Sequence, residues 1–401
     1  MRKHLWLVVA LGLLCMCGLA CSVTFAETGT TASGAGSFNV LHSFGTVMDD
    51  GEAPWGSLIV SGRTFYGMTA YGGANGYGAI FEFNTKTGQD TVLYSFKGYS
   101  ENDGEYPEGS LILSGRTLYG MTSEGGPNDY GTIFEFNTKT GQYTNLHSFG
   151  TVTDDGKGPY GSLTLSGGSL YGMTSEGGLT NDGTIFEFNT KTGQYTVLHS
   201  FGTVTGDGET PYGSLVLSGK TLYGMTGDGG ATNNGTIFSF NTKTGQYTVL
   251  YSFKGGTEDG GTPYGSLVVS GKNLYGMTGN GGANTEGTIF SFNTKTGQCA
   301  VLHSFGSVTG DGSNPYYGDN LILSGKTLYG MTTDGGTDDD GAIFSFNTKT
   351  GQYTVLHSFT GATTDGSVPY GSLILSGKHF YGMTENGGAD DDGVLFSFSL
   401  K

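Results

Sequence analysis

Hydrophobic and polar positions alternate in short segments along most of the chain, and clusters of Gly, Asn and Asp separate these segments. In the unit from 211 to 262, β-branched and aromatic residues fill segments 211–218, 221–226, 235–240 and 246–253. Short alternating runs between turn residues are typical of β-strands. No window shows helical periodicity, so the pattern predicts an all-β fold.

This four-strand unit is repeated along the chain. The motif Tyr-Gly-Met-Thr recurs at intervals of 52 to 54 residues, starting at Tyr66, Tyr119, Tyr171, Tyr223, Tyr275, Tyr329 and Tyr381. Repeats of this length build solenoids, propellers or arrays. Four short antiparallel strands per unit in seven units predict a seven-bladed β-propeller.

The two ends of the chain complement each other. Segment 393–398 reads as a third strand without a fourth, and segment 38–44 reads as a fourth strand without the first three. We therefore predict that the N-terminal strand completes the last blade, which removes two sheet edges that invite aggregation. Residues 37–401 are assigned to a single propeller domain.

Three motifs carry a resemblance to a known family: Leu-Tyr-Gly-Met-Thr-x-x-Gly-Gly, Gly-Thr-Ile-Phe-x-Phe-Asn and Val-Leu-His-Ser-Phe. The sequence resembles the GloVer tandem-repeat family of secreted bacterial proteins, over nearly the whole chain after its N-terminal segment. The layout is also similar to kelch repeats, without their defining residues. The resemblance implies a protein that is attached to the cell surface or released, and it implies no activity.

The N-terminal segment predicts export. Basic residues Arg2 and Lys3 precede an apolar run from 5 to 20, and Ala26 offers a cleavage site. This order is typical of a secretory signal peptide over 1–26, followed by a flexible leader over 27–36. A lipid anchor at Cys21 is the alternative. We expect a secreted or cell-surface protein, or a periplasmic or lipid-anchored one, without a membrane span.

The net charge and the cysteine content disfavour some binding partners and exclude intrachain disulfides within the repeats. The formal net charge of −17 repels phosphate backbones, so nucleic-acid binding is disfavoured. Within the repeats Cys299 has no second cysteine to pair with, and it takes a slot that holds Tyr in most other units. We expect a monomer that gains no stability from intrachain disulfides. The 76 Gly residues are mostly accounted for by turn positions of the repeat.

In a propeller of this kind, the fourth-to-first connections and the second-to-third loops share one face, here called the top face. The turns of the opposite face carry most of the basic residues, whereas the top loops carry most of the acids. Two rings are predicted on the top face. One consists of an Asp before Gly in every unit: Asp50, Asp103, Asp155, Asp207, Asp259, Asp311 and Asp365. The other consists of an aromatic residue after Pro at the channel mouth: Trp55, Tyr160, Tyr212, Tyr264, Tyr316 and Tyr370, with Glu108 in the second unit.

Each ring has two interpretations. The Asp residues suit turns, in which they accept backbone N–H groups, and they also suit Ca²⁺ ligation. The aromatic residues suit packing between blades, and they also suit stacking on sugars beside carboxylate and amide acceptors. Calcium is the one cofactor that the sequence suggests.

Catalysis requires acid and base groups in different environments, and near-identical repeats do not supply them. The departures from symmetry are Glu108 and an insertion in the sixth unit that contains Asp319. These two carboxylates form the candidate catalytic pair, as in glycosidases. The sequence favours a non-catalytic propeller that binds a glycan or a surface partner with its acidic, aromatic top face. A carbohydrate-active lyase or hydrolase and a purely structural surface protein are the alternatives.

Overall fold

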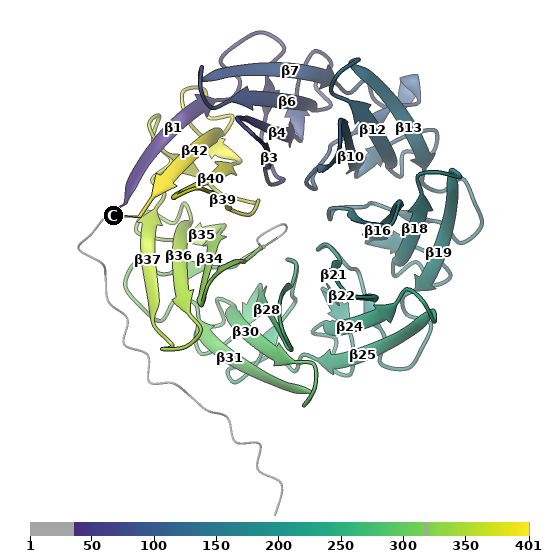
Figure 1. The fold of residues 1–401 in the computed structure, drawn as a ribbon. Helices are drawn as coiled ribbons and strands as arrows, with labels where there is room; N and C mark the ends of the chain where they lie inside the picture. Colours follow the sequence, from purple (N-terminus) through teal and green to yellow (C-terminus); the bar gives the residue numbers. More distant parts are fainter. Residues whose placement is uncertain (1–35, 317–319, 401) are drawn as a thin grey trace, which may run out of the picture.

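The computed structural model describes residues 36–316 and 320–400, which form seven four-stranded antiparallel sheets arranged as blades around a central channel (Figure 1). This confirms the predicted seven-bladed β-propeller. From the channel outward, the first four blades are β3 (Ile59–Ser61), β4 (Thr64–Thr69), β6 (Ala79–Asn84), β7 (Gln89–Ser95); β9 (Ile112–Ser114), β10 (Thr117–Thr122), β12 (Thr132–Asn137), β13 (Gln142–Ser148); β15 (Thr164–Ser166), β16 (Ser169–Thr174), β18 (Thr184–Asn189), β19 (Gln194–Ser200); β21 (Val216–Ser218), β22 (Thr221–Thr226), β24 (Thr236–Asn241), β25 (Gln246–Ser252). The last three are β27 (Val268–Ser270), β28 (Asn273–Thr278), β30 (Thr288–Asn293), β31 (Gln298–Ser304); β33 (Ile322–Ser324), β34 (Thr327–Thr332), β36 (Ala342–Asn347), β37 (Tyr353–Ser358); β39 (Ile374–Ser376), β40 (His379–Thr384), β42 (Val394–Ser399), β1 (Ser37–Ser43).

The ring closes as the sequence predicts. Strand β1 pairs antiparallel with β42, from Ser37 opposite Ser399 to Ser43 opposite Val394. In Figure 1 the purple β1 accordingly lies beside the yellow β42 at the outer edge of the seventh blade. The signal peptide, the leader up to residue 35, the lipid-anchor alternative at Cys21 and Asp319 lie outside the described residues.

A feature that the sequence did not predict is a small two-stranded antiparallel sheet on the top face of each blade. A two-residue strand in each fourth-to-first connection pairs with a two-residue strand in the following second-to-third loop, so these two loops do share one face. The pairs are β2 (Gly51–Glu52) with β5 (Tyr71–Gly72), β8 (Gly104–Glu105) with β11 (Glu124–Gly125), β14 (Gly156–Lys157) with β17 (Glu176–Gly177), β20 (Gly208–Glu209) with β23 (Asp228–Gly229), β26 (Gly260–Gly261) with β29 (Asn280–Gly281), β32 (Gly312–Ser313) with β35 (Asp334–Gly335), and β38 (Gly366–Ser367) with β41 (Asn386–Gly387). A short 3₁₀ helix, η1 (Tyr99–Glu101), precedes β8.

The innermost strands are shorter than predicted. In the fourth blade the pattern predicts a strand over 211–218, but only Val216–Ser218 pairs with β22. The preceding residues bond to the next blade instead, because the backbone N–H of Ser214 donates to the hydroxyl of Ser266 at 2.7 Å. The same link joins Ser110 to Ser162 at 2.7 Å. Residues around the channel therefore tie neighbouring blades together rather than extending their own sheet.

The hydrophobic core lies between blades. In one cluster, Met121, Ile133 and Phe149 of the second blade pack on Leu163 and Phe186 of the third, and all five are at most 4% exposed. Six similar clusters occupy the other seams between neighbouring blades. Each seam buries apolar side chains of two units, so closure of the ring removes the last exposed blade face from water.

The Gly of Tyr-Gly-Met-Thr has a packing role. A Cβ placed on Gly224 would lie 2.5 Å from the Phe238 ring, which packs across the strand pair β22–β24. Real Cβ atoms do not approach other atoms this closely. The motif therefore needs Gly here so that the buried Phe of the third strand can lie against the backbone.

No helix among the described residues is both long and apolar enough to cross a membrane.

Candidate functional site

The seven predicted Asp residues lie at the outer rim of the top face, one in each seam, and all are buried. In the fourth unit the Asp207 carboxylate accepts the backbone N–H of Gly208 at 2.9 Å and a hydrogen bond from His199 Nε2 at 3.1 Å. His199 lies on β19, the outermost strand of the third blade. Asp207 therefore connects the outer edge of that blade to the loop that enters the fourth blade. Burial alone would raise the pKa of Asp207, but hydrogen bonds, foremost that from His199, hold it below the usual range.

The same two bonds recur in every unit. The donor on the outer strand is His42, His147, His199, His303 or His357 in five units and the hydroxyl of Tyr94 or Tyr251 in the other two. Both side chains offer a donor at the same reach, which explains why they alternate in one sequence slot. Turn and rim hydrogen bonding thus accounts for all seven Asp residues, which we call the rim aspartates. Their predicted ligation of Ca²⁺ stays a prediction.

In five of the seven seams an aromatic residue completes the rim site by stacking on the donor. The Tyr195 ring lies 3.8 Å from that of His147, and the Tyr247 ring lies 3.7 Å from that of His199, both nearly parallel. Cys299 occupies this stacking slot beside Tyr251. Burial raises the pKa of the Cys299 thiol, so it is a poor nucleophile, as expected for a Tyr replacement.

The predicted mouth aromatics are half-buried and contact one another around the channel. Ring centroids lie 5.3 Å apart for Tyr160 and Tyr212, 5.4 Å for Tyr212 and Tyr264, and 5.8 Å for Tyr264 and Tyr316. These four residues form a continuous arc from the third to the sixth blade. Both interpretations of the ring are therefore compatible with its geometry, because the rings pack between blades and keep part of their surface exposed.

Sequence reasoning missed three further aromatic residues on this face. Trp55 contacts Tyr370 at 5.3 Å and Tyr71 at 6.0 Å, and Tyr71 in turn lies 5.2 Å from Tyr106. Tyr77 contacts Tyr106 at 6.2 Å. At the positions of Tyr71 and Tyr106 the other units carry different residues, and Tyr77 recurs only as Tyr130 in the second unit, so no sevenfold repeat signal marked them. The signal that could have found them is a concentration of Tyr in the variable top positions of the first two units.

Those variable positions stand on a constant backbone. The second residue before each mouth residue has a positive φ in every unit, between 44° and 62°: Ala53, Tyr106, Gly158, Thr210, Thr262, Asn314 and Val368. In each case its N–H donates to a carbonyl of the preceding blade, as in Thr210 to Asp182 at 3.0 Å. A positive φ is costly for β-branched residues and persists only where the surroundings impose it. The top face therefore holds a fixed conformation while its side chains differ from blade to blade.

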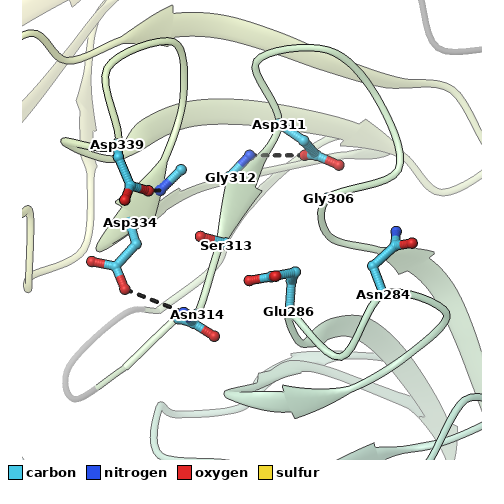
Figure 2. Close-up of a pocket in the computed structure, with 10 residues that line it drawn as sticks. Asn284, Glu286, Gly306, Asp311, Gly312, Ser313, Asn314, Asp334 and Asp339 are labelled. Atoms are coloured by element: carbon cyan, nitrogen blue, oxygen red, sulfur yellow. Dashed lines mark hydrogen bonds between the residues drawn. The ribbon is translucent and has the colours of Figure 1, made fainter.

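A polar pocket of about 450 Å³ lies between the fifth and sixth blades on the top face (Figure 2). Its polar side chains come from two second-to-third loops and the connection between them: Asn284, Glu286, Ser313, Asn314, Asp334 and Asp339. Asn314 precedes Pro315 and the mouth residue Tyr316, so the pocket adjoins one end of the aromatic arc.

Carboxylates dominate the pocket. The Asn314 amide donates to Asp334 Oδ2 at 3.3 Å, and the N–H of Gly335 donates to Asp339 Oδ1 at 3.0 Å, as Figure 2 shows. Burial raises the pKa of Asp334, the Asn314 amide opposes this shift, and the charge of Asp339 adds to it. Acidic and amide oxygens at a concave site suit ligands rich in hydroxyl donors.

Of the candidate catalytic pair, only Glu108 can be placed. It takes its position in the mouth ring, where the Ser123 hydroxyl donates to its Oε1 at 2.9 Å. Burial raises the pKa of Glu108 to about 8, and the Ser123 hydrogen bond only partly offsets this. Glu108 is thus largely protonated at neutral pH.

Comparison with solved structures shows the propeller fold. An oligogalacturonate lyase in complex with manganese matches with a TM-score of 0.56 and 13% identity over 92% of this chain and 99% of that one. Oligogalacturonate lyase from Vibrio parahaemolyticus matches with a TM-score of 0.56 and 12% identity, over 92% of this chain and 99% of that one. A putative 6-phosphogluconolactonase from Bacteroides uniformis matches with a TM-score of 0.53 and 18% identity, over 84% of this chain and 94% of that one. At these identities the likeness concerns the fold alone. No curated protein matches the sequence significantly.

A family model described as the Gloeobacter/Verrucomicrobia repeat matches residues 26–207, 151–318 and 307–401. These segments together span nearly the whole chain, and the match confirms the resemblance drawn from the repeat motifs.

Proposed function

The chain belongs to the Gloeobacter/Verrucomicrobia repeat family, and we propose that it is an exported, non-catalytic propeller that binds a glycan with its top face. The observation that carries the proposal is the arc of mutually contacting, half-exposed mouth tyrosines from Tyr160 to Tyr316. Flat aromatic faces bind the C–H faces of sugar rings, and nearby carboxylate and amide oxygens accept sugar hydroxyls.

The polar pocket supports the same proposal. It lies at the end of the arc, and its volume of about 450 Å³ is in the range of small-ligand sites. One sugar unit in the pocket and further units along the arc would give several weak contacts to one polymer. Such contacts add through multivalency, so an extended glycan is a better candidate than a monosaccharide.

Export rests on the predicted signal peptide over 1–26, which lies outside the described residues. An exported acidic protein meets extracellular polysaccharides and other cell surfaces. A protein partner on the top face is the competing occupant, because that face also exposes Val47, Val152 and Val204.

Binding of the mature chain to an array of polysaccharides, with and without Ca²⁺, tests the proposal. We expect one class of glycan to bind, and we expect Tyr212→Ala and Tyr264→Ala to weaken binding at least tenfold. Tyr99→Ala is the matched control, because Tyr99 is 59% exposed in η1 and is not part of the arc. Absence of binding to any glycan, or equal loss in all three variants, would contradict the proposal. A requirement for Ca²⁺ would support ligation by the rim aspartates.

A second function, cleavage of the bound polysaccharide, is favoured by one observation. Glu108 is buried at the channel mouth beside the Ser123 hydroxyl, and burial raises its pKa to about 8, which suits a general acid. Under this proposal Asp319 is its partner. Product release that persists in the double variant Glu108→Gln, Asp319→Asn would exclude this pair.

A further inference from the structure

The seam between the seventh and first blades, here called the closing seam, differs chemically from the others. His42 lies on β1 of the seventh blade, Asp50 precedes β2, and Asp90 lies on β7 of the first blade. One ligand atom from each of these residues lies within 4.8 Å of the other two. His42 Nε2 and Asp50 Oδ2 are 3.2 Å apart.

Asp90 occupies the slot that stacks on the rim donor in the other seams. That slot holds Tyr143, Tyr195, Tyr247, Cys299, Tyr353 and, on β1, Phe38. In those seams the slot is apolar or aromatic, and the Phe38 ring stacks at 4.4 Å on that of His357. The closing seam places a carboxylate there instead, beside a His–Asp pair that is otherwise the same.

The carboxylate of Asp90 is not satisfied by the protein. Its Oδ1 atom is buried and has no hydrogen-bond partner. A buried acceptor without a partner costs about 1–3 kcal/mol, and more when it is charged. The side chains around it are also shielded, since those of Asp50 and His42 are 1% and 13% exposed. A carboxylate with such an oxygen, clustered with an imidazole and a second carboxylate, is suited to bind a cation.

We propose that His42, Asp50 and Asp90 bind a divalent transition-metal ion of the Zn²⁺ type at the closing seam. The 3.2 Å contact of His42 with Asp50 is the rim hydrogen bond that the other His-containing seams also make, so the ion would replace it, and Asp90 is the ligand particular to this seam. One imidazole and two carboxylates suit Zn²⁺ or Co²⁺, whereas Ca²⁺ takes six to eight oxygen ligands. The ion links β1 of the seventh blade to β7 of the first blade across the seam between them.

Titration of the purified metal-free chain with Zn²⁺ in a calorimeter tests this inference. We expect one equivalent to bind, with a rise in melting temperature. Asp90→Tyr installs the residue that four other seams carry, so it should fold normally and lose at least 100-fold in affinity. Asp390→Asn removes an exposed carboxylate from a top loop of the seventh blade and should bind as the unaltered chain does.

Cobalt gives a second measurement. Co²⁺ bound by the unaltered chain should show the intense visible absorption of a four-coordinate ion, and Asp90→Tyr should not. If Asp90→Tyr fails to fold, Asp90→Asn serves in its place and should weaken binding at least tenfold. Absence of a stoichiometric site for Zn²⁺ in the unaltered chain, or equal binding by the Asp90 variants, would overturn the inference.

Discussion

At the outer rim every unit places an aspartate in the same environment, whereas two positions before the mouth residue the seven units place six different residue types on the same backbone. The rim carboxylates each accept a Gly N–H and a His or Tyr donor, as Asp155 does from Gly156 and His147. The mouth positions with positive φ range from Ala53 to Tyr106 to Val368.

The difference indicates that the rim residues stabilise the fold, whereas the mouth residues are available for binding. Where a side chain completes a hydrogen-bond network that every seam needs, the units keep it. Where the backbone alone makes the link between blades, the side chain is free to differ, and surface loops on a rigid scaffold are where binding residues gather. Substitutions at the two regions should therefore have opposite consequences, for stability at the rim and for binding at the mouth.

Removal of a rim aspartate should have the largest effect on stability. Asp207→Ala leaves the buried N–H of Gly208 and the His199 ring without their acceptor, and we expect the free energy of unfolding to fall by about 3 kcal/mol. Urea denaturation measures this loss. Asp338→Ala, at an exposed carboxylate of a top loop, is the control and should cost less than about 0.5 kcal/mol. Equal effects would mean that the rim bonds are not structural.

The strand glycine should come next. Gly224→Ala forces a Cβ to within 2.5 Å of the buried Phe238 ring, and overpacking of this kind costs about 2 kcal/mol. Gly227→Ala, three residues further along, should cost much less: its Cβ would lie 3.0 Å from the Tyr264 ring, but Ser175 and Thr333 occupy the equivalent position in units whose next mouth residue is also Tyr. Thermal unfolding of both variants gives the comparison. If Gly224→Ala leaves the melting temperature unchanged, the packing around Phe238 can rearrange at little cost.

Glu108 should make stability depend on pH. Its pKa of about 8 in the folded chain exceeds that of an unfolded Glu, so the folded state holds a proton that the unfolded state has lost. This contribution is complete below about pH 4.3 and is lost as the pH rises to about 8. Glu108→Gln removes it, so the variant should gain stability relative to the unaltered chain between about pH 5 and pH 8.5. If the difference in the free energy of unfolding between Glu108→Gln and the unaltered chain is the same at both pH values, the burial of Glu108 is contradicted.

The repeat allowed the fold to be predicted almost completely, because its strands, turns and split ends are visible in each unit. It could not reveal what lies between units. The two-residue strand pairs, such as Gly208–Glu209 with Asp228–Gly229, and the Ser214 to Ser266 link join segments that no local pattern connects. The sequence predicted the ring of mouth aromatics, whose role stays a prediction, but it could not show that Tyr71 and Tyr106 extend this ring from Trp55, since contacts between variable side chains arise only from the ring's geometry.

The smallest expected effect is also the sharpest test of the rim. His199→Tyr should change the free energy of unfolding by less than about 1 kcal/mol, because a Tyr hydroxyl already bonds to the rim aspartate in the unit of Tyr94, at 2.6 Å from Asp103. The new ring would stack on Tyr247 as Tyr94 stacks on Tyr143, with centroids 4.3 Å apart and planes at 3°. His199→Leu keeps the bulk and removes the donor, so it should cost about 2 kcal/mol more than His199→Tyr in the same urea series. If the two variants are equally stable, stacking rather than the hydrogen bond holds the rim, and the units keep their aspartate for another reason.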